Sequence, residues 1–554
     1  MLGSTEDVPS RMLGVRKTVS PVRFFDPRML TLARWVSERY VVPLAAVLKR
    51  LSPPRVASEE DPELQGDGEE LHHGAGPIRP SAPAVGSADG GFLSRYRNGA
   101  GLVDALTAPR TGAFVLRPAP EEETAVAVEA VGATLEVGRR AIVLVPEARP
   151  VPATAAAVLA AFRGRAVVFL GGDRRSRYRT WLEVAGGRGD VIVGTRPAVF
   201  APVRDLGLLY VSRESHPAHR EDRVPYSHVR DVALARGRLE DAVTILASIC
   251  PSSEASALKR PEVAPASRRW PPVEVVKPGP EGRAPRLVRA IREAKRGFVF
   301  APVPGYGVAQ VCRTCGAAAA CVACGGSLRS VEGHLRCAVC EAPGRCASCG
   351  GSHFGIRRGG AERVEEWAAA VSPGRVRRVT RPRLPKAGEI IIGGPEVVRD
   401  LGPGGLDLVA IVDADLAERR PGLTARERAL TVWMEAVAWA QPGGRAIVQA
   451  TNAGDPAIQA LVRGNPDRFH EDERRRREAA GFPVGVAAFR VAGPLGLEEA
   501  LRMHEPTTML VTSAGGQTVC LLALAPERVP AFGRALRDMA ARGEVARVEA
   551  EPHL

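Results

Sequence analysis

Residues 191–211 read VIVGTRPAVFAPVRDLGLLYV and contain two short apolar runs, VIVG and LGLLYV, on either side of a proline-containing loop. Further runs of this kind, AFVL, AIVLV, AVVFL and VTILAS, occur between about residues 111 and 250. Helical stretches such as TAAAVLAAF and HVRDVALAR separate them. Short aliphatic runs that alternate with helices are typical of a parallel sheet covered by helices on both faces. This part of the chain therefore predicts an α/β lobe.

The same alternation resumes after Trp270 with VEVV, GFVFAP, EIIIGG, LDLVAIVDAD and GRAIVQA, and a cysteine-rich segment interrupts it. A second α/β lobe is therefore expected, followed by a small α+β domain. A short helical unit is expected at 29–49, where apolar residues recur at helical spacing. The predicted organisation is an N-terminal helical unit at 1–56, an acidic Gly/Pro-rich linker at 57–95, lobe 1 at 96–269, lobe 2 at 270–480 with an insert at 308–352, and a C-terminal domain at 481–554.

Composition narrows the class of protein. The chain has 554 residues, and its 76 Lys and Arg against 62 Asp and Glu give a formal net charge of +14. An excess of positive charge favours a polyanionic partner, most simply nucleic acid. No charge-free apolar run approaches the roughly 18 residues that a membrane span needs, and the start, MLGSTEDVPSR, lacks the pattern of a secretory signal. We expect a cytoplasmic, nucleoid-associated protein without membrane contact.

Eight of the ten cysteines form four CxxC pairs, which indicate metal binding in a chain without a secretion signal. Two such pairs complete one tetrahedral S₄ zinc site, so eight thiolates predict two structural Zn²⁺ ions. The outer pairs can share one ion and the inner pairs the other, or the pairs can be used in sequential order; the five-residue loops favour nesting. The nested sites are Cys312, Cys315, Cys346 and Cys349 for zinc 1, and Cys321, Cys324, Cys337 and Cys340 for zinc 2. The remaining cysteines, Cys250 and Cys520, are expected to be buried apolar thiols.

Several stretches together resemble primosomal protein N′, the PriA family of replication restart helicases. They occur in the family's order and are VIVGTRPAVFAPVRDLGLLYV with HVRDVALAR (191–236), SICPSSEAS (248–256), GYGVAQVCRTCG before the cysteine block, DADLAERRPGLTARERAL (413–430) and FHEDERRRREAAGFP (469–483). The resemblance implies two RecA-like motor lobes with a zinc module inserted in the second. It also implies that residues 1–56 are the remnant of an N-terminal DNA-binding domain, most of which is lost or precedes a misassigned start.

The resemblance also shows where this chain departs from the family. The place of the phosphate-binding loop, residues 117–124, reads RPAPEEET and has neither glycine nor lysine, so a triphosphate would meet negative charge. In SRESH, Ser212 and Arg213 stand where the family has its magnesium-holding Asp and catalytic Glu. In MEAVAWAQPGGRA (434–446), a lone Arg445 follows the place of the arginine-finger motif. The two lobes are therefore predicted to be degenerate helicase lobes without ATP binding, and no catalytic or nucleotide-binding residue is assigned.

Three smaller sets of residues have both a functional and a purely structural interpretation. The run Arg474, Arg475, Arg476 and Arg477 could contact DNA phosphates, or form a solvated helix face paired with Glu471 and Glu473. Asp413 and Asp415 could bind a metal, but a capping and turn role is expected. His216 and His219, near Glu214, could form a metal or acid-base site, but surface loop histidines are expected.

These observations predict a DNA-binding replication restart protein that recognises stalled or branched forks and helps reload the replication machinery, without helicase activity of its own. The expected partners are branched or single-stranded DNA and other primosome and replication proteins. Two alternatives remain open at this point. One is an active 3′–5′ DNA helicase with a divergent nucleotide site, and the other is a zinc-ribbon adaptor that binds only proteins.

Overall fold

The computed structural model describes most of the chain in detail. The described residues are 18–60, 91–108, 111–267, 269–279, 282–301, 308–314, 321–322, 328–331, 334–337, 342–346, 349–358, 361–402, 404–415, 422–514 and 516–552. Statements about the structure concern these residues. His72 and His73 of the expected linker lie outside them.

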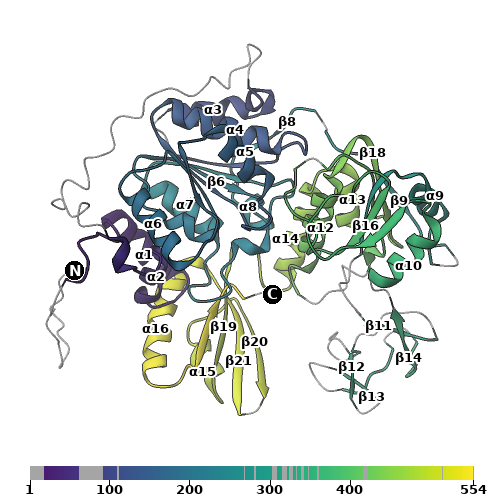
Figure 1. Cartoon of the computed structure of the whole chain (residues 1–554). Coiled ribbons are helices and arrows are strands. Elements are labelled where there is room, and N and C mark those ends of the chain that lie inside the picture. The colour runs from purple at the N-terminus through teal and green to yellow at the C-terminus, as the bar shows by residue number, and fades with distance from the viewer. Residues whose placement is uncertain are drawn as a thin grey trace.

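Lobe 1 is built on an eight-stranded sheet in the order β1-β8-β2-β7-β6-β3-β5-β4, parallel except for β1 (Figure 1). Alternate residues of β3 belong to different hydrophobic cores, so helices cover both faces of the sheet. The strands are β1 (Tyr96–Arg97), β2 (Gly112–Leu116), β3 (Arg140–Leu144), β4 (Ala166–Phe169), β5 (Val191–Gly194), β6 (Leu206–Ser212), β7 (Val243–Ala247) and β8 (Glu262–Pro265). The helices are α3 (Gly99–Thr107), α4 (Glu123–Glu136), α5 (Ala153–Ala161), α6 (Arg174–Ala185), α7 (Val229–Leu239) and α8 (Ser253–Ala257).

Lobe 2 contains a six-stranded, fully parallel sheet in the order β15-β16-β10-β17-β18-β9. Its strands are β9 (Val273–Val276), β10 (Arg296–Phe300), β15 (Arg375–Arg378), β16 (Glu389–Gly393), β17 (Leu406–Ile411) and β18 (Ala440–Gln449). Its helices are α9 (Pro285–Glu293), α10 (Ala361–Val371), α12 (Ala425–Val437), α13 (Pro456–Arg463) and α14 (Asp467–Ala479). The cysteine-rich insert leaves this lobe after β10 and carries two antiparallel strand pairs, β11 (Val308–Cys312) with β14 (Phe354–Arg358) and β12 (Leu328–Val331) with β13 (His334–Cys337).

The C-terminal domain is a four-stranded antiparallel sheet in the order β20-β21-β19-β22. Its elements are β19 (Ala487–Pro494), α15 (Leu497–Arg502), β20 (Thr508–Ala514), β21 (Gln517–Leu524), α16 (Val529–Ala541) and β22 (Arg547–Ala550). The predicted fold class is therefore confirmed: two α/β lobes with parallel sheets, a cysteine-rich insert in the second and a small α+β domain at the end. Cys250 and Cys520 are buried, as expected.

The expected N-terminal helical unit consists of two helices, α1 (Pro27–Arg39) and α2 (Leu44–Leu51). Pro43 explains the break, because proline lacks the N–H that a helix interior needs and restricts the residue before it. The Asp26 side chain caps α1 by accepting a hydrogen bond from the Met29 N–H at 2.7 Å. In Figure 1 this unit lies between lobe 1 and α16 of the C-terminal domain.

One hydrophobic core joins these three parts of the chain. Val36 of α1, Ile142 of lobe 1 and Phe489 of the C-terminal domain all belong to it and are fully buried. The Tyr40 hydroxyl strengthens the junction, because it donates to Asp231 at 3.0 Å and accepts from the His228 N–H at 3.1 Å. The C-terminal domain is therefore packed into lobe 1 and is not a separately hinged module. In the part of the chain that the structure describes, no helix has both the length and the apolarity that a membrane crossing requires.

Candidate functional site

The turn between β2 and α4 carries the segment RPAPEEET, and arginines neutralise its three glutamates. Glu121 pairs with Arg269 at 3.2 Å, Glu122 pairs with Arg269 and with Arg95 at 3.4 Å, and Glu123 pairs with Arg213 at 3.2 Å. The carboxylates of this turn are therefore not bare, and the negative charge that a triphosphate would meet is smaller than the sequence alone implies. Each glutamate of this turn is paired with an arginine, and these arginine side chains lie beside the turn.

Tyr96 occupies part of the same turn. Its hydroxyl accepts a hydrogen bond from the Ala119 N–H at 2.9 Å and donates to Glu122 at 2.9 Å. A phosphate-binding loop works by leaving its backbone N–H groups to the phosphate oxygens. In this chain a tyrosine hydroxyl engages one of those N–H groups.

Arg213, at the end of β6, joins the two lobes through a buried ion cluster. Its guanidinium lies 3.2 Å from Glu123 of lobe 1, and 3.1 Å from Glu435 and 3.8 Å from Asp400 of lobe 2. None of these four side chains is more than 9% exposed. We call this set, Arg213, Glu123, Asp400 and Glu435, the interlobe clasp. Two segments that the sequence marked separately, RPAPEEET and SRESH, thus meet in an ion pair.

Asp400 also holds the start of α5. Its carboxylate accepts a hydrogen bond from the Thr154 N–H at 3.0 Å, and its carbonyl accepts from the Ala153 N–H at 2.9 Å. Around the clasp, three further contacts cross between the lobes: Arg117 with Asp467 at 2.9 Å, Arg477 with Glu254 at 2.7 Å, and the Ser253 hydroxyl with Glu427 at 2.7 Å. The lobes are therefore joined along an extended polar interface.

The clasp contains three carboxyl groups for one guanidinium. The single positive charge therefore cannot fully compensate the burial of three negative charges. Burial raises the pKa of Glu123 to about 7 against the opposing attraction of Arg213, and burial also raises the pKa of Glu435. A carboxyl group whose pKa is higher in the folded state holds its proton more tightly there. The stability that this proton provides is present below the unfolded pKa and is lost as the pH rises through the folded pKa.

Replacing Glu123 with Gln tests this directly. Between about pH 5 and pH 8, the titration of Glu123 should lower the free energy of unfolding of the unmodified protein by up to roughly 3 kcal/mol relative to that of Glu123→Gln, because the variant lacks the titrating group. Urea unfolding at several pH values measures it. Glu527→Gln, at an exposed glutamate, is the matched control. An unchanged pH slope in Glu123→Gln would contradict the assignment.

The remaining residues of SRESH are enclosed. Glu214 accepts hydrogen bonds from Arg230 at 2.8 Å and from the Ser252 hydroxyl at 2.7 Å, and it is fully buried. The expectation of surface loop histidines is wrong for His219, which is fully buried with its Nε2 2.8 Å from the Ser212 carbonyl. Burial lowers the pKa of His219 to about 4, so it is neutral near pH 7. His216 is half-buried and accepts from the Ala218 N–H at 3.1 Å.

The other residues that the sequence marked near this interface have structural partners. Arg445, in β18, pairs with Glu293 of α9 at 2.9 Å. Asp413 binds Arg283 at 2.9 Å, and Asp415 accepts from the Thr451 N–H and hydroxyl, which fits the expected turn role.

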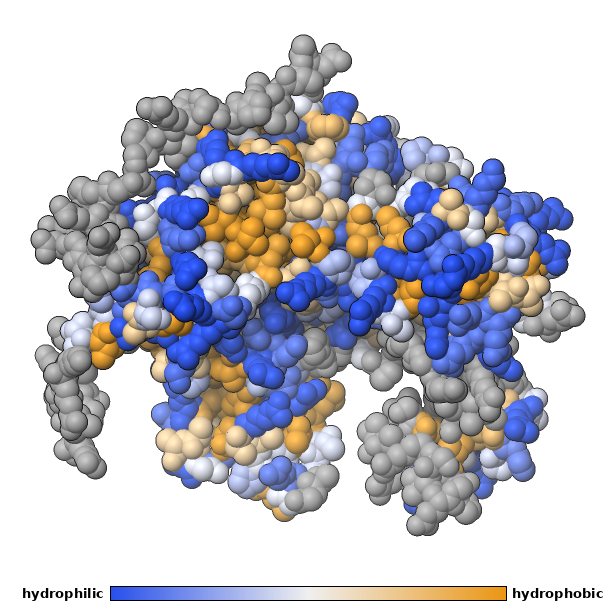
Figure 2. Space-filling view, viewed as in Figure 1, coloured by the Kyte–Doolittle hydropathy of each residue, from blue (hydrophilic) through white to orange (hydrophobic). Residues whose placement is uncertain are grey.

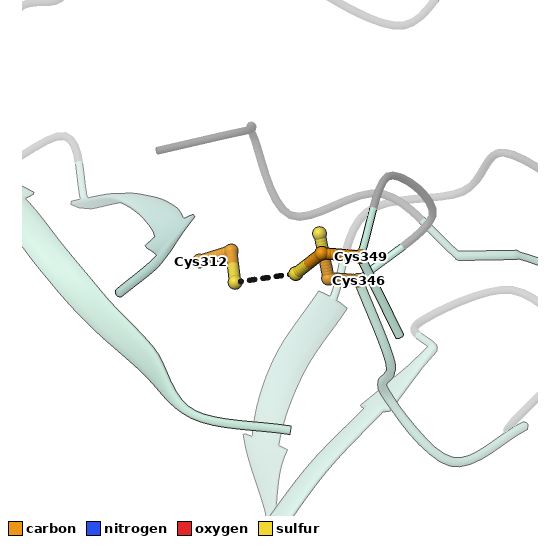
Figure 3. Close-up of side chains that lie close together, drawn as sticks. All are labelled: Cys312, Cys346 and Cys349. Carbon is orange, nitrogen blue, oxygen red and sulfur yellow. Dashed lines mark hydrogen bonds between the residues drawn. The ribbon is translucent and has the colours of Figure 1, made fainter. Parts of the chain in front are cut away.

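Three cysteines of the insert gather into one cluster (Figure 3). The Sγ atoms of Cys312, Cys346 and Cys349 lie within 4.8 Å of one another, and those of Cys312 and Cys349 are 3.4 Å apart. Cys312 ends β11, whereas the other two lie close together in the chain, where the Gly350 N–H donates a hydrogen bond to the Cys346 carbonyl at 2.8 Å. Gly350 has φ +72°, which glycine adopts readily. A β-carbon at Gly351 would lie 3.3 Å from the Cys349 sulfur, so a small residue is needed there.

The cluster fits a zinc site of the nested kind. Tetrahedral Zn–S bonds of about 2.3 Å place neighbouring sulfurs roughly 3.8 Å apart, close to the spacing found here. Its three members are three of the four ligands predicted for zinc 1; the fourth, Cys315, lies outside the described residues. Cys321, which sequential pairing would have placed with Cys312, is described and does not join the group.

Of the four ligands predicted for zinc 2, the structure describes Cys321 and Cys337. Both are buried. Cys324 and Cys340 lie outside the described residues. The assignment of ligands and the number of ions stay predictions.

Elemental analysis with cysteine variants tests the zinc prediction. The intact protein should contain about two zinc ions per chain, and Cys346→Ser should contain about one because it removes a ligand of zinc 1 only. Cys250→Ala, at a buried cysteine outside the insert, should retain both ions. A full zinc content in Cys346→Ser would show that Cys346 is not a zinc ligand in either pairing.

The structure places the predicted DNA-binding run on α14. Arg474 and Arg475 pair with Glu471 at 3.0 and 2.8 Å, and Arg476 lies 3.9 Å from Glu473. Arg477 is buried and pairs with Glu254 across the lobe interface. The first three are exposed enough to reach a phosphate, but Arg477 has a structural role. DNA contact by this run stays a prediction.

A second basic region was not foreseen from the sequence. A cleft of about 700 Å³ between the lobes is lined by Arg50, Arg149, Arg196 and Arg399, together with Glu147, Glu221 and Glu396. We call it the basic cleft. Its lobe 2 wall continues into the segment 375–383, RVRRVTRPR, which has five arginines and no acidic residue. Hydrophilic residues cover much of lobe 2 on the face shown in Figure 2. The run of arginines in this segment is the sequence feature from which a basic region could have been predicted.

Comparison with known proteins agrees with the sequence motifs. Probable replication restart protein PriA of Mycobacterium tuberculosis is 27% identical over 91% of this chain and 81% of its own length. Probable replication restart protein PriA of Mycobacterium leprae is 29% identical over 86% and 78%, and replication restart protein PriA of Treponema pallidum is 29% identical over 84% and 74%. The chain is a homologue of the PriA replication restart proteins. No family model matches it.

Solved structures resemble this PriA homologue only weakly. The DUF1998 helicase MrfA bound to DNA is 12% identical, with a TM-score of 0.37 over 76% of this chain and 59% of its own length. The E. coli DExH-box NTPase HrpB is 13% identical, with a TM-score of 0.35 over 66% and 42%. Scores this low do not establish a shared arrangement of domains.

Proposed function

We propose that this PriA homologue binds stalled or branched DNA forks and helps to reload the replication machinery, without unwinding DNA itself. The observation that carries the proposal is the interlobe clasp, in which Arg213 pairs with Glu123 between the two segments that the family resemblance assigns to nucleotide and magnesium. Its relatives are named as replication restart proteins, which supports the biological role. We place the protein in the cytoplasm, at the nucleoid.

The clasp opposes nucleotide-driven motion of the lobes. A motor must open and close the cleft between its lobes in each cycle, and here opening would separate Arg213 from Glu435 and Asp400. Removing one partner from a buried ion pair costs about 3–5 kcal/mol, because the other charge is left without compensation. A nucleotide at the RPAPEEET turn would also have to displace Tyr96 from the Ala119 N–H.

The basic cleft supplies a surface for the DNA backbone. Arg149 is exposed at its lobe 1 wall, and Arg381 is exposed in the basic segment that continues from its lobe 2 wall. Arginine side chains bind phosphates with charge-assisted hydrogen bonds and release counterions when they do so. The cleft therefore favours DNA binding that is strong at low salt and weak at high salt. The insert, with its two zinc ions, then forms a rigid platform for DNA or for other primosome proteins.

Fork binding should depend on these exposed arginines. The double variant Arg149→Ala, Arg381→Ala should bind a labelled fork about ten-fold more weakly near 50 mM salt, and its slope of log affinity against log salt should be shallower by roughly 2. Fluorescence anisotropy measures both. Arg542→Ala, at an exposed arginine of the C-terminal domain, should bind as the unchanged protein does.

ATP turnover measured on the same preparation separates the alternatives. We expect no DNA-stimulated hydrolysis. Hydrolysis that is stimulated by DNA and abolished by Arg213→Ala would instead establish a divergent helicase. A chain that holds its zinc but retains no fork at low salt would be a protein-binding adaptor.

A further inference from the structure

A second cavity lies between the two lobes. It has a volume of about 380 Å³, within the range of small-molecule sites. Lobe 1 contributes the loops after β3 and β6, and lobe 2 contributes α12, the end of β10 and the loop after β16. We call it the interlobe pocket. It adjoins the basic cleft, because four residues line both: Glu147, Ala218, Glu396 and Arg399.

One face of α12 forms a wall of the interlobe pocket. Four lining residues of this helix recur at intervals of three or four positions: Ala425, Ala429, Val432 and Glu435. Side chains at this spacing lie on the same side of a helix. Apolar residues from the other elements also line the cavity: Pro217, Phe300, Pro395 and Val398. These walls suit a ligand with an apolar or aromatic body better than a hydrated ion.

The charged groups of the interlobe pocket nearly balance. Its lining contains three carboxyl groups and two guanidiniums, which belong to Glu147, Glu396, Glu435, Arg399 and Arg428. Glu147 pairs with Arg399, and Glu435 pairs with Arg213 of the clasp at 3.1 Å. Because both signs of charge are present in similar number, the lining favours neither an anion nor a cation. An uncharged ligand therefore suits the pocket best.

Glu435 brings a buried hydrogen-bond acceptor to the pocket face of α12. Its side chain is 3% exposed, and its Oε2 is the atom that pairs with Arg213. Its Oε1 has no hydrogen-bond partner among the described residues. Buried carboxylate oxygens without a partner are uncommon in folded proteins. An N–H group of a bound ligand would satisfy this oxygen.

His216 supplies a hydrogen-bond donor from the lobe 1 side of the pocket. Burial lowers the pKa of His216 to about 3, so its imidazole is neutral near pH 7. Its Nδ1 accepts a hydrogen bond from the Ala218 N–H at 3.1 Å, which leaves the ring proton on Nε2. This Nε2 has no hydrogen-bond partner among the described residues. The pocket thus offers one donor and one acceptor beside apolar walls.

We propose that the interlobe pocket binds a nucleobase, which is an uncharged, planar heterocycle. The edge of a base carries N–H donors for Glu435 and nitrogen or carbonyl acceptors for His216, and its faces pack against apolar side chains. The adjoining basic cleft carries the exposed Arg149, which suits a phosphate next to such a base. The base belongs either to a strand in that cleft, a source that rests on the proposed function, or to a free nucleoside.

An abasic scan of the single-stranded arm of a fork tests the strand source with the full-length protein. Forks that each lack one base should bind equally well in fluorescence anisotropy, except at one position, where the affinity should fall about ten-fold because the base contacts are lost. His216→Ala removes the donor and Ala429→Phe fills the cavity, so that position should no longer matter in either variant. His504→Ala, at a half-buried histidine of the C-terminal domain, is the matched control and should retain the effect. Thermal midpoints close to that of the unchanged protein show that the variants are folded.

Isothermal titration with adenosine, guanosine, cytidine and thymidine tests the free source. Saturable binding of about one equivalent of a nucleoside that is lost in Ala429→Phe, with equal binding of all the forks, assigns the pocket to a free nucleoside. Equal binding of all the forks without saturable nucleoside binding overturns the proposal, and so does an effect that both pocket variants retain. Fork binding that Arg149→Ala, Arg381→Ala does not weaken contradicts the proposed function instead, and the nucleoside titration still decides the pocket.

Discussion

Arg213 carries a full positive charge inside the protein, and carboxyl groups from both lobes surround it. A guanidinium cannot lose its proton under ordinary conditions, so its burial requires carboxylates within a few ångströms. Glu123 provides one from lobe 1, and Asp400 and Glu435 provide two from lobe 2. This requirement fixes the two sheets in one relative position. It also explains why glutamates can stand at the start of α4, where their negative charge suits the helix N-terminus.

Carboxylates outside the clasp are also paired with arginines. The fully buried Glu214 has Arg230 and Ser252 around it, and Glu59 and Glu60, at the beginning of the expected linker, are held by Arg179 and Arg55. With few lysines in the chain, arginine provides most of these contacts and forms them with its planar, multidentate group. Many of the arginines are therefore paired with carboxylates of the same chain. Arg149 in the basic cleft and Arg381 in its neighbouring segment are exposed to solvent, where a polyanion could reach them.

The N-terminal helices and the C-terminal domain are packed against lobe 1. They share one hydrophobic core with lobe 1, through Val36, Ile142 and Phe489. The insert, in contrast, extends from lobe 2, and its described residues form two short antiparallel strand pairs (Figure 1). A small module of this kind lacks the apolar surface to fold by burial, and metal ligation is the usual source of its stability. We therefore expect the body of the protein to be stabilised by its hydrophobic cores and the insert by metal ligation through its cysteines.

The sequence by itself determined the two α/β lobes, the insert and the C-terminal domain, because strand-like apolar runs and CxxC spacing are local patterns. It also marked RPAPEEET and SRESH as altered segments. Only the tertiary structure decided that Glu123 and Arg213 meet, that His219 is buried and that Arg477 crosses to Glu254, since partners 90 and 223 residues apart leave no periodic signal. The clasp and the basic cleft both arise where separate parts of the chain pack together, and long-range packing is set by the fold as a whole.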